Sequence, residues 1–268
     1  MGVEREGVVR IIMVVVITNQ KGGVGKSTTA EALACGLVRK SFRTLLVDLD
    51  PQCSITLTSG ADAGKPTSFD VLVKTNSAQE ATQQRTHEVT RADIIPASVM
   101  LSRLDLHLTA TGKEHRLKEQ LSPLYGSYDY IVVDTPPALG ILTINALTAA
   151  DTLIIPAQAD VYSLQGIWQL TYTIDTIRAY TNPGLRIAGI LLTRHNPRTI
   201  LSRDMADVAD ATAKRIGTFL YTTVIRESVV IKEAQVNRQP IYDYAPKSNA
   251  AADYMAFTDE FLERSKHE

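Results

Sequence analysis

The segment from Asn19 to Thr28 constrains this chain more than any other part of it. It reads Asn-Gln-Lys-Gly-Gly-Val-Gly-Lys-Ser-Thr and lies between a β-branched run, Ile11 to Thr18, and an apolar-periodic pattern from Ala30 to Val38. Glycines in such a turn let backbone N–H groups curl around an anion without interference from Cβ atoms. The N-terminus of a following helix points its partial positive charge at the same place. The sequence therefore predicts a strand, a phosphate-binding loop and a helix, in that order.

Two side chains of this loop have defined expected roles. In the P-loop pattern, the lysine at the position of Lys26 reaches the β- and γ-phosphates, and the hydroxyl at the position of Ser27 ligates Mg²⁺. A glycine-rich turn without a ligand is the alternative, but strand, glycines, lysine, hydroxyl and helix come in the order that phosphate binding requires. We therefore predict a nucleoside triphosphate and Mg²⁺ as ligands. The nucleotide-binding residues predicted from the loop are Gly22, Gly23, Val24, Gly25, Lys26, Ser27 and Thr28.

A pair of carboxylates follows the next apolar run. Thr44 to Asp48 has the residues of a short buried strand, and Asp50 stands two positions beyond its end. In an open parallel sheet, ligands bind at the carboxyl ends of the strands. A turn or a helix cap would also explain these residues. Beside a phosphate loop, however, the carboxylates favour a role in phosphoryl transfer, which needs an oriented nucleophile more than a strong base.

A second acidic strand end comes at Tyr130 to Asp134, followed by Thr-Pro-Pro. Asp commonly ends strands, so this feature alone is weak evidence. Its distance from the P-loop and the sequence Asp-Thr-Pro-Pro-Ala-Leu-Gly favour a Walker B arrangement. A carboxylate at this place holds Mg²⁺ through a water, and the Pro-Pro turn with Gly140 is a candidate switch that senses the γ-phosphate. The residues predicted around the metal from these motifs are Ser27 and Asp134.

Apolar runs of strand length alternate with helical patterns along the chain, and the connections are long enough for parallel pairing. We expect an α/β chain with a three-layer P-loop NTPase-like fold, in which a mostly parallel, twisted sheet carries helices on both faces. No repeat or Gly/Ser linker divides the chain, so we expect one domain over residues 13–268 after a short extension at 1–12. Further expected strands are Asp93–Ala97, Leu104–Leu108, Thr152–Pro156, Leu185–Thr193 and Thr222–Ile225, and expected helices are Lys113–Leu124, Leu164–Tyr180, Leu201–Ile216, Ser228–Val236 and Ser248–Arg264. Residues 59–91 read as short helices and loops.

Composition narrows the possible classes. Hydrophobic residues make up 44% of the chain and charged residues 21%, which is typical of a soluble globular protein. The longest apolar run, around Ile11 to Ile17, is far shorter than the roughly 20 residues of a membrane-spanning helix. Cys35 and Cys53 give no disulfide framework or CxxC spacing, and the histidines form no HxxxH pair. With a formal net charge of -1, any nucleic-acid surface must be a local patch.

These motifs resemble those of the ParA and MinD group of ATPases, and of ParA and Soj proteins in particular. The resemblance covers nearly the whole chain, in QKGGVGKST, LLVDLDPQ and IVVDTPPALG and, more loosely, in LLTRHNPRT, KEAQ and PIYDYAPKSNAA. Gln20 stands where the usual loop has its first Gly, and Lys21 follows it, as in the deviant Walker A loop of this group.

The resemblance implies ATP as the nucleotide and a mechanism built on dimers. Lys21 would reach across a homodimer with ATP sandwiched between the subunits and contact the partner's phosphates. The residue matching Asp50 would position or activate the attacking water, Asp48 would assist Ser27 and Asp134 around the metal, and Asn196 would contact the adenine. The expected catalytic residues are Lys21, Lys26 and Asp50.

The resemblance also implies partners: non-specific DNA in the ATP state, and a ParB-like centromere-binding adaptor that stimulates an otherwise slow hydrolysis. The expected place is the cytoplasm, on the nucleoid when ATP is bound. Residues 178–247 hold 11 Lys or Arg against 6 Asp or Glu, which permits a DNA-facing patch and equally permits solvated side chains. Val230 stands where partition ATPases often carry an Arg. The predicted DNA phosphate contacts are Arg226, Lys232, Arg238 and Lys247.

Three other classes of ATPase share some of these motifs. A MinD-like ATPase would need a basic amphipathic C-terminal helix for membrane binding, but the polar side of residues 257–264 is acidic and would be repelled by anionic lipid. No membrane partner is therefore expected. A regulatory ATPase that positions a protein assembly stays open as the alternative to DNA segregation. A nitrogenase-reductase-like redox ATPase is excluded, because Cys35 and Cys53 are not placed to bridge an iron–sulfur cluster.

Overall fold

A six-stranded sheet forms the centre of the molecule. The computed structural model describes residues 12–62, 64–84, 91–196 and 200–266. The strands lie in the order β3-β2-β4-β1-β5-β6, and every neighbouring pair is parallel. Their bounds are β1 Met13–Ile17, β2 Thr44–Asp48, β3 Asp93–Ile95, β4 Tyr130–Asp134, β5 Thr152–Ala157 and β6 Arg186–Leu192. Since parallel strands all end at the same edge, loops from distant parts of the chain meet there.

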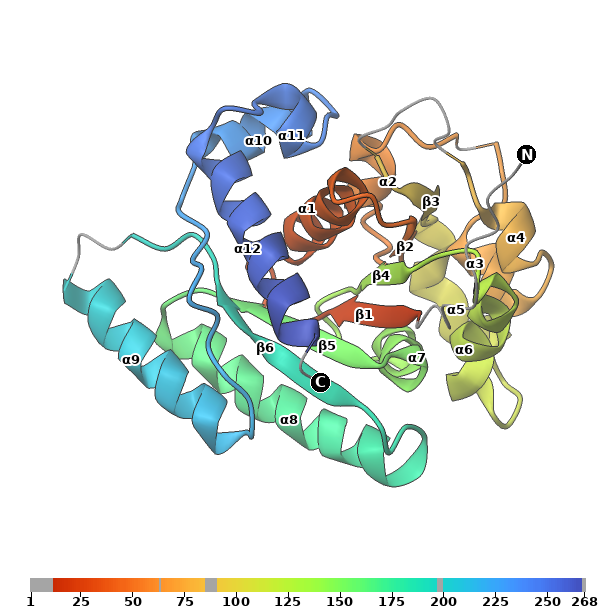
Figure 1. Ribbon diagram of the computed structural model, residues 1–268. Helices are drawn as coiled ribbons and strands as arrows, with labels where there is room; N and C mark the ends of the chain where they lie inside the picture. Colours follow the sequence, from red (N-terminus) through yellow and green to blue (C-terminus); the bar gives the residue numbers. More distant parts are fainter. Residues whose placement is uncertain (1–11, 63, 85–90, 197–199, 267–268) are drawn as a thin grey trace, which may run out of the picture.

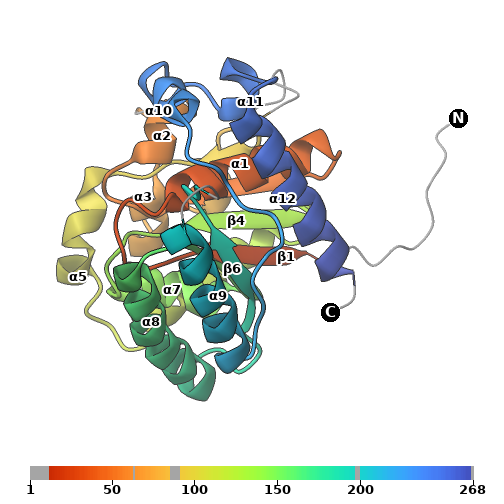
Figure 2. The same cartoon turned by 90° about the vertical axis from the view of Figure 1, so that its left-hand side faces the viewer.

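Helices cover both faces of the sheet (Figure 1). Figure 2 shows α10, α11 and α12 on one side, with α7, α8 and α9 on the other. The α-helices of the described residues are α1 Lys26–Arg39, α2 Ser54–Thr58, α3 Ser68–Val73, α4 Ala78–Ala81, α5 Leu104–His107, α6 Arg116–Leu121, α7 Ile141–Ala149, α8 Val161–Tyr180, α9 Ile200–Arg215, α10 Val229–Val236, α11 Ile241–Tyr244 and α12 Asn249–Ser265. Short 3₁₀ turns occur at Val99–Arg103, Lys113–His115 and Ser122–Leu124. This is the predicted three-layer α/β arrangement.

Alternating side chains of each central strand enter two separate cores. In β1, Val14 and Val16 belong to the cluster beneath α7 and α8, whereas Val15 and Ile17 belong to the cluster beneath α1 and α12. Both faces of a strand are buried when helices cover a parallel sheet on each side, so its sequence is a continuous apolar run. The run Met-Val-Val-Val-Ile is such a strand.

Two expected strands do not form. The alternating leucines of Leu104–Leu108 predict a strand, but residues 104–107 are the helix α5. Leu104 and Leu108, four positions apart, are buried, while Leu106 is 76% exposed, so the apolar period here is helical. At Thr222–Ile225 no strand forms, and isolated bridges occur only on either side of this segment, from Leu220 to Ile190 of β6 and from Arg226 to His195. Its ladder is interrupted because the Glu260 carboxylate accepts the backbone N–H groups of Thr222 and Thr223.

The other elements expected from the sequence are present within four residues of their expected bounds, and residues 59–84 contain the short helices α3 and α4 with loops. The extension expected at 1–12 lies outside the described residues except for Ile12. Across the described ranges, no helix combines the length and the apolar character needed to cross a membrane.

Candidate functional site

The loop between β1 and α1 has the backbone geometry of an anion cradle. Gly23 and Gly25 have φ angles of 74° and 83°, which side-chain-bearing residues rarely adopt. Gly25 is the N-cap of α1 and offers no side chain to its first turn, and that turn holds no acidic residue. The first N–H groups of an α-helix lack intrahelical partners, so here they face the cleft in front of the loop.

Lys26 is the first residue of α1 and lies beneath the loop. Its Nζ donates to the Lys21 carbonyl at 2.9 Å and its residue surface is only 6% exposed. Burial lowers the pKa of Lys26, and the nearby carboxylates of Asp134 and Asp50 oppose that shift. The Lys26 ammonium group lies at the positive end of α1, where a polyphosphate would bind. The negative charge of the phosphates would further stabilise the charged form of this lysine.

Asp134 ends β4 in the centre of the site. It pairs in register with Ile17 of β1 and with Asp48 of β2, so the three strand ends meet at this carboxylate. Among the described residues, neither buried oxygen of Asp134 has a hydrogen-bond partner of good geometry. Burial and then the charge of Asp48 raise the pKa of Asp134 well above its usual range, while the nearby Ser27 hydroxyl and then Lys26 act in the opposite direction. Such an orphaned carboxylate fits a bound cation.

The donor set fits Mg²⁺ better than a metal held by protein alone. Within the described ranges, no group of three or more His, Cys, Asp or Glu side chains is arranged to hold a metal. Mg²⁺ usually takes one or two carboxylates, keeps water and uses the substrate's phosphate oxygens. Ser27, next to the lysine at the start of α1, supplies the hydroxyl that the P-loop pattern requires.

Asp48 and Asp50 shape the loop after β2. One oxygen of Asp48 accepts the Asp50 N–H at 3.0 Å, and the other accepts the backbone and side chain of Thr56 at 3.0 and 2.7 Å. Burial raises the pKa of Asp48 to about 6, although the bonds from Thr56 and Asp50 oppose the rise. Asp50 accepts the Gln52 N–H at 2.9 Å and lines the cleft. Asp48 thus holds the loop that presents Asp50.

Lys21 forms an ion pair within its own chain. Its Nζ lies 2.6 Å from Asp160 Oδ2 and 3.2 Å from Ser163 Oγ. The other oxygen of Asp160 accepts the Ser163 N–H at 2.9 Å and so caps α8. Partial burial alone would raise the pKa of Asp160, but the bonds from Lys21 and Ser163 outweigh it and lower the pKa. The lysine predicted to act on a partner subunit is therefore held at the start of α8 in the single chain.

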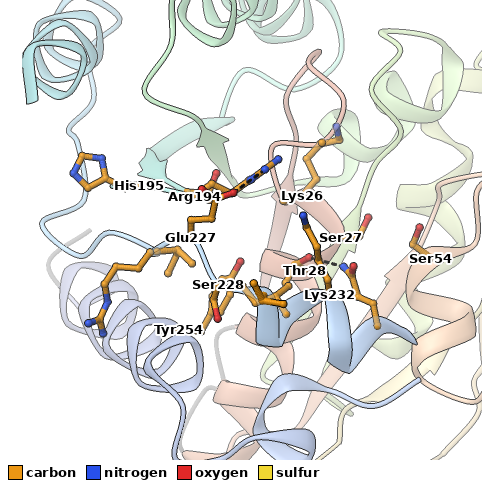
Figure 3. Close-up of a pocket in the computed structure, with 18 of the residues that line it drawn as sticks. Lys26, Ser27, Thr28, Ser54, Arg194, His195, Glu227, Ser228, Lys232 and Tyr254 are labelled. Atoms are coloured by element: carbon orange, nitrogen blue, oxygen red, sulfur yellow. Dashed lines mark hydrogen bonds and ion pairs between the residues drawn. The ribbon is translucent and has the colours of Figure 1, made fainter. Parts of the chain in front are cut away.

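The loops enclose one cavity of about 1010 Å³ in front of the phosphate loop. Lys26, Ser27 and Thr28 line it from the phosphate loop and α1, and Arg194, His195, Glu227 and Ser228 line it from two later loops (Figure 3). Asp50 and Asn196, the expected adenine contact, are also among the lining residues. Within this lining, Arg194 pairs with Glu227 at 2.9 Å. The cavity has a volume that suits a nucleotide.

Several side chains of this cleft were not predicted from the sequence. Thr193 donates to the Val24 carbonyl at 2.8 Å, the hydroxyls of Thr29 and Tyr254 lie 3.4 Å apart, and Gln235 donates to Thr28 at 3.2 Å. The KEAQ motif contains Gln235, but nothing in the motif itself indicates that its amide reaches the phosphate loop. These contacts join the last third of the chain to the first helix.

The four residues predicted to contact DNA differ in their surroundings. Arg226 forms an ion pair with Asp253, with Nε and a terminal nitrogen at 2.9 and 2.6 Å from the two carboxylate oxygens. Lys232 lines the nucleotide cleft. Arg238 and Lys247 are exposed and lie outside the residues that line the cavity.

The amino-acid sequence of this chain is similar to those of several known proteins. Residues 12–187 match the family model AAA_31, described as an AAA domain. The sporulation initiation inhibitor protein Soj of Bacillus subtilis is 38% identical over 92% of this chain and 97% of its own length. The chromosome partitioning protein ParA of Myxococcus xanthus is 36% identical over 94% of this chain and 88% of its own length.

One solved structure carries ligands that bear on the cleft. The cobyrinic acid a,c-diamide synthase of Mycobacterium smegmatis, solved with bound ADP and magnesium, superposes with a TM-score of 0.81 at 32% sequence identity. The match covers 96% of each chain. The same enzyme was also solved with a bound ATP analog and magnesium, so a protein of the same fold and related sequence binds the kinds of ligand that the phosphate loop predicts for this chain.

Proposed function

The chain belongs to the AAA-domain family that its residues 12–187 match, and within it to the ParA/Soj group of P-loop ATPases, and from that premise we propose that it is an ATP-dependent, dimerising switch ATPase that partitions DNA. The reaction is hydrolysis of ATP to ADP and phosphate. One observation carries the proposal: a glycine-rich helix N-terminus, the buried Lys26 and the carboxylates Asp50 and Asp134 converge at one end of a nucleotide-sized cleft. Each group acts on the triphosphate or on the water that attacks it.

Lys26 and the N–H groups of residues 22–28 bind the phosphates. Asp50 orients the attacking water, which is the part of phosphoryl transfer that most depends on positioning. Ser27 and Asp134 hold Mg²⁺, with Asp48 supporting the loop beside them. When bound, the ion supplies charge neutralisation between the β- and γ-phosphates. Asn196 contacts the adenine, and its place in the lining of the same cavity as the ion pair of Arg194 with Glu227 supports that role.

The switch is the change between monomer and dimer. In the ATP state Lys21 leaves Asp160 and binds the phosphates of the partner subunit, so that two chains close over two nucleotides. The present ion pair supports this cycle, because it gives Lys21 a defined resting place that is only partly buried and so can be exchanged. The two arginines among the described residues that line the cleft, Arg194 and Arg226, are paired with Glu227 and Asp253, which fits a slow intrinsic rate.

The proposed output is non-specific DNA binding by the dimer, with the protein on the nucleoid while ATP is bound. Exposed basic side chains on the surface that follows α10 support it, chiefly Arg238 and Lys247, with Arg226 available when its bond to Asp253 opens. A ParB-like adaptor bound to a centromere site then stimulates hydrolysis and returns the protein to monomers.

Co-sedimentation with DNA tests this function. Wild-type protein is mixed with DNA of unrelated sequences in ATP, in ADP and without nucleotide, each at two salt concentrations. We expect retention in ATP alone, without sequence preference, and a steep loss at the higher salt because the contacts are to phosphates. Equal retention in all three nucleotide states, or none in ATP while ATP is bound, would contradict the DNA-partition function.

A further inference from the structure

Helix α10 forms a wall of the nucleotide cleft, and two of its side chains face the phosphate loop. Lys232 and Gln235 are three positions apart, so they lie on one helix face. Both line the cavity, and the Gln235 amide donates to the Thr28 hydroxyl at 3.2 Å. The buried Ala234 faces the core shared with α1. The helix is thereby fixed with Lys232 on the side of the cleft, where Figure 3 draws it beside Thr28.

The position of Gln235 shows how near Lys232 is to the expected phosphates. Thr28 follows Ser27 in the first turn of α1, where backbone N–H groups hold the α- and β-phosphates in the P-loop pattern. Gln235 touches this turn directly, and Lys232 lies one helical turn nearer to the start of α10. A lysine carries its charge at the end of a flexible four-carbon chain, so its length is sufficient to approach the turn that the shorter Gln235 side chain contacts from one helical turn away.

The charge around Lys232 also belongs to the cleft. Glu227 lines the same cavity, and its pKa is lowered mainly by Arg194 and in smaller part by Lys232. Arg194 and Glu227 satisfy each other at 2.9 Å, whereas Gln235 is neutral. Lys232 therefore adds positive charge to the wall of the cleft that α10 forms.

We propose that Lys232 is a phosphate ligand of the bound nucleotide, and not a DNA contact as its place in a basic stretch suggests. The inference rests on the proposed function, because it requires a nucleotide in this cleft. In this proposal α10 lies over the α- and β-phosphates of the nucleotide. Lys232 and the hydrogen bond from Gln235 to Thr28 hold the helix there. Since both phosphates are present in ADP and ATP, Lys232 strengthens the binding of either nucleotide.

Titration calorimetry of Lys232→Ala with ATP and with ADP, both in excess Mg²⁺, tests this assignment. We expect Kd to rise about three- to thirtyfold for both nucleotides, as for loss of a charge-assisted bond at a partly solvated site. Lys232→Arg should recover most of the affinity, because it keeps the charge. Lys118→Ala removes an exposed lysine of α6, far from the cleft lining, and is the matched control for loss of one positive charge. Thermal unfolding checks that all variants fold.

A second measurement separates nucleotide binding from DNA binding. At ATP concentrations that saturate each variant, Lys232→Ala should co-sediment with DNA as wild type does. Unchanged Kd values for both nucleotides would overturn the inference, and so would loss of DNA retention at saturating ATP. Failure of the proposed function looks different: the wild-type protein itself would bind no ATP, or would bind ATP without retaining DNA.

Discussion

The ion pair between Lys21 and Asp160 leads to a prediction about dimerisation: the negative charge of Asp160 holds Lys21 within its own chain and so opposes the dimer. If Lys21 must reach a partner subunit, it must first leave Asp160 Oδ2, 2.6 Å away. Asp160 has a second role, because its other oxygen caps α8 through the Ser163 N–H. Asp160→Asn keeps a good capping residue and removes the charge, whereas Asp160→Ala removes both. The Asn variant therefore isolates the restraint on Lys21.

The size of the effect follows from solvent exposure. The side chains of Lys21 and Asp160 are 29% and 33% exposed, so the pair resembles the stronger surface ion pairs and contributes about 0.5–1 kcal/mol. A dimer must open two such pairs, one in each subunit, which costs about 1–2 kcal/mol in total. Since 1.4 kcal/mol corresponds to tenfold, Asp160→Asn should lower the dimer dissociation constant in ATP about five- to thirtyfold.

Analytical ultracentrifugation in saturating ATP and Mg²⁺ measures that constant, in an Asp50→Ala background that prevents turnover. Asp175→Asn is the matched control, since Asp175 lies on the same helix and makes an exposed pair with Arg178 at 3.7 Å. The control should dimerise as the parent does. A dissociation constant for Asp160→Asn equal to that of the parent, with thermal unfolding unchanged, would refute the reasoning that Lys21 is restrained by this pair.

Three further outcomes are expected. Asp50→Ala should bind ATP and dimerise but lose ATP turnover in a phosphate-release assay, and unchanged turnover would remove Asp50 from its role. Lys21→Ala should weaken ATP-dependent dimerisation more than nucleotide binding, and equal loss of both would argue against action on the partner subunit. Burial raises the pKa of Glu31 to about 7, so its contribution to stability is present below its ordinary pKa of 4.5 and is lost as the pH rises through 7. Glu31→Gln keeps an acceptor for the Thr58 hydroxyl, now 2.7 Å from Glu31, and should stabilise the protein by about 2–4 kcal/mol at pH 8 with little gain at pH 4, measured by urea unfolding; an equal gain at both pH values would contradict this.

The strands and the phosphate loop were predictable from the sequence because their signals are local. Six apolar runs match the six strands of the sheet, and the glycines with Lys26 identify the loop without knowledge of any distant residue. Asp134 and Asp50 were predictable too, since parallel strands bring all their carboxyl ends to one edge. The failed strand at Leu104–Leu108 shows the limit of such patterns: five residues with alternating leucines fit a strand and one turn of helix equally well.

Contacts between distant parts of the chain were not predictable. The partner of Lys21 lies 139 positions away and that of Thr28 lies 207 positions away, and neither has a sequence pattern that names the other. The basic region of residues 178–247 illustrates the same point. Its net charge is visible in the sequence, but whether a given side chain faces solvent, Asp253 or the nucleotide cleft depends on how α10 and α12 pack.

The central claim is that the loop before α1 binds ATP with Mg²⁺, and calorimetric titration of the wild-type protein and Lys26→Ala tests it most directly. We predict one ATP bound per wild-type chain, dependence of the affinity on Mg²⁺, and no measurable binding to a Lys26→Ala variant that unfolds at the wild-type temperature. Absence of binding to the wild type, or an unchanged affinity in Lys26→Ala, would contradict the account.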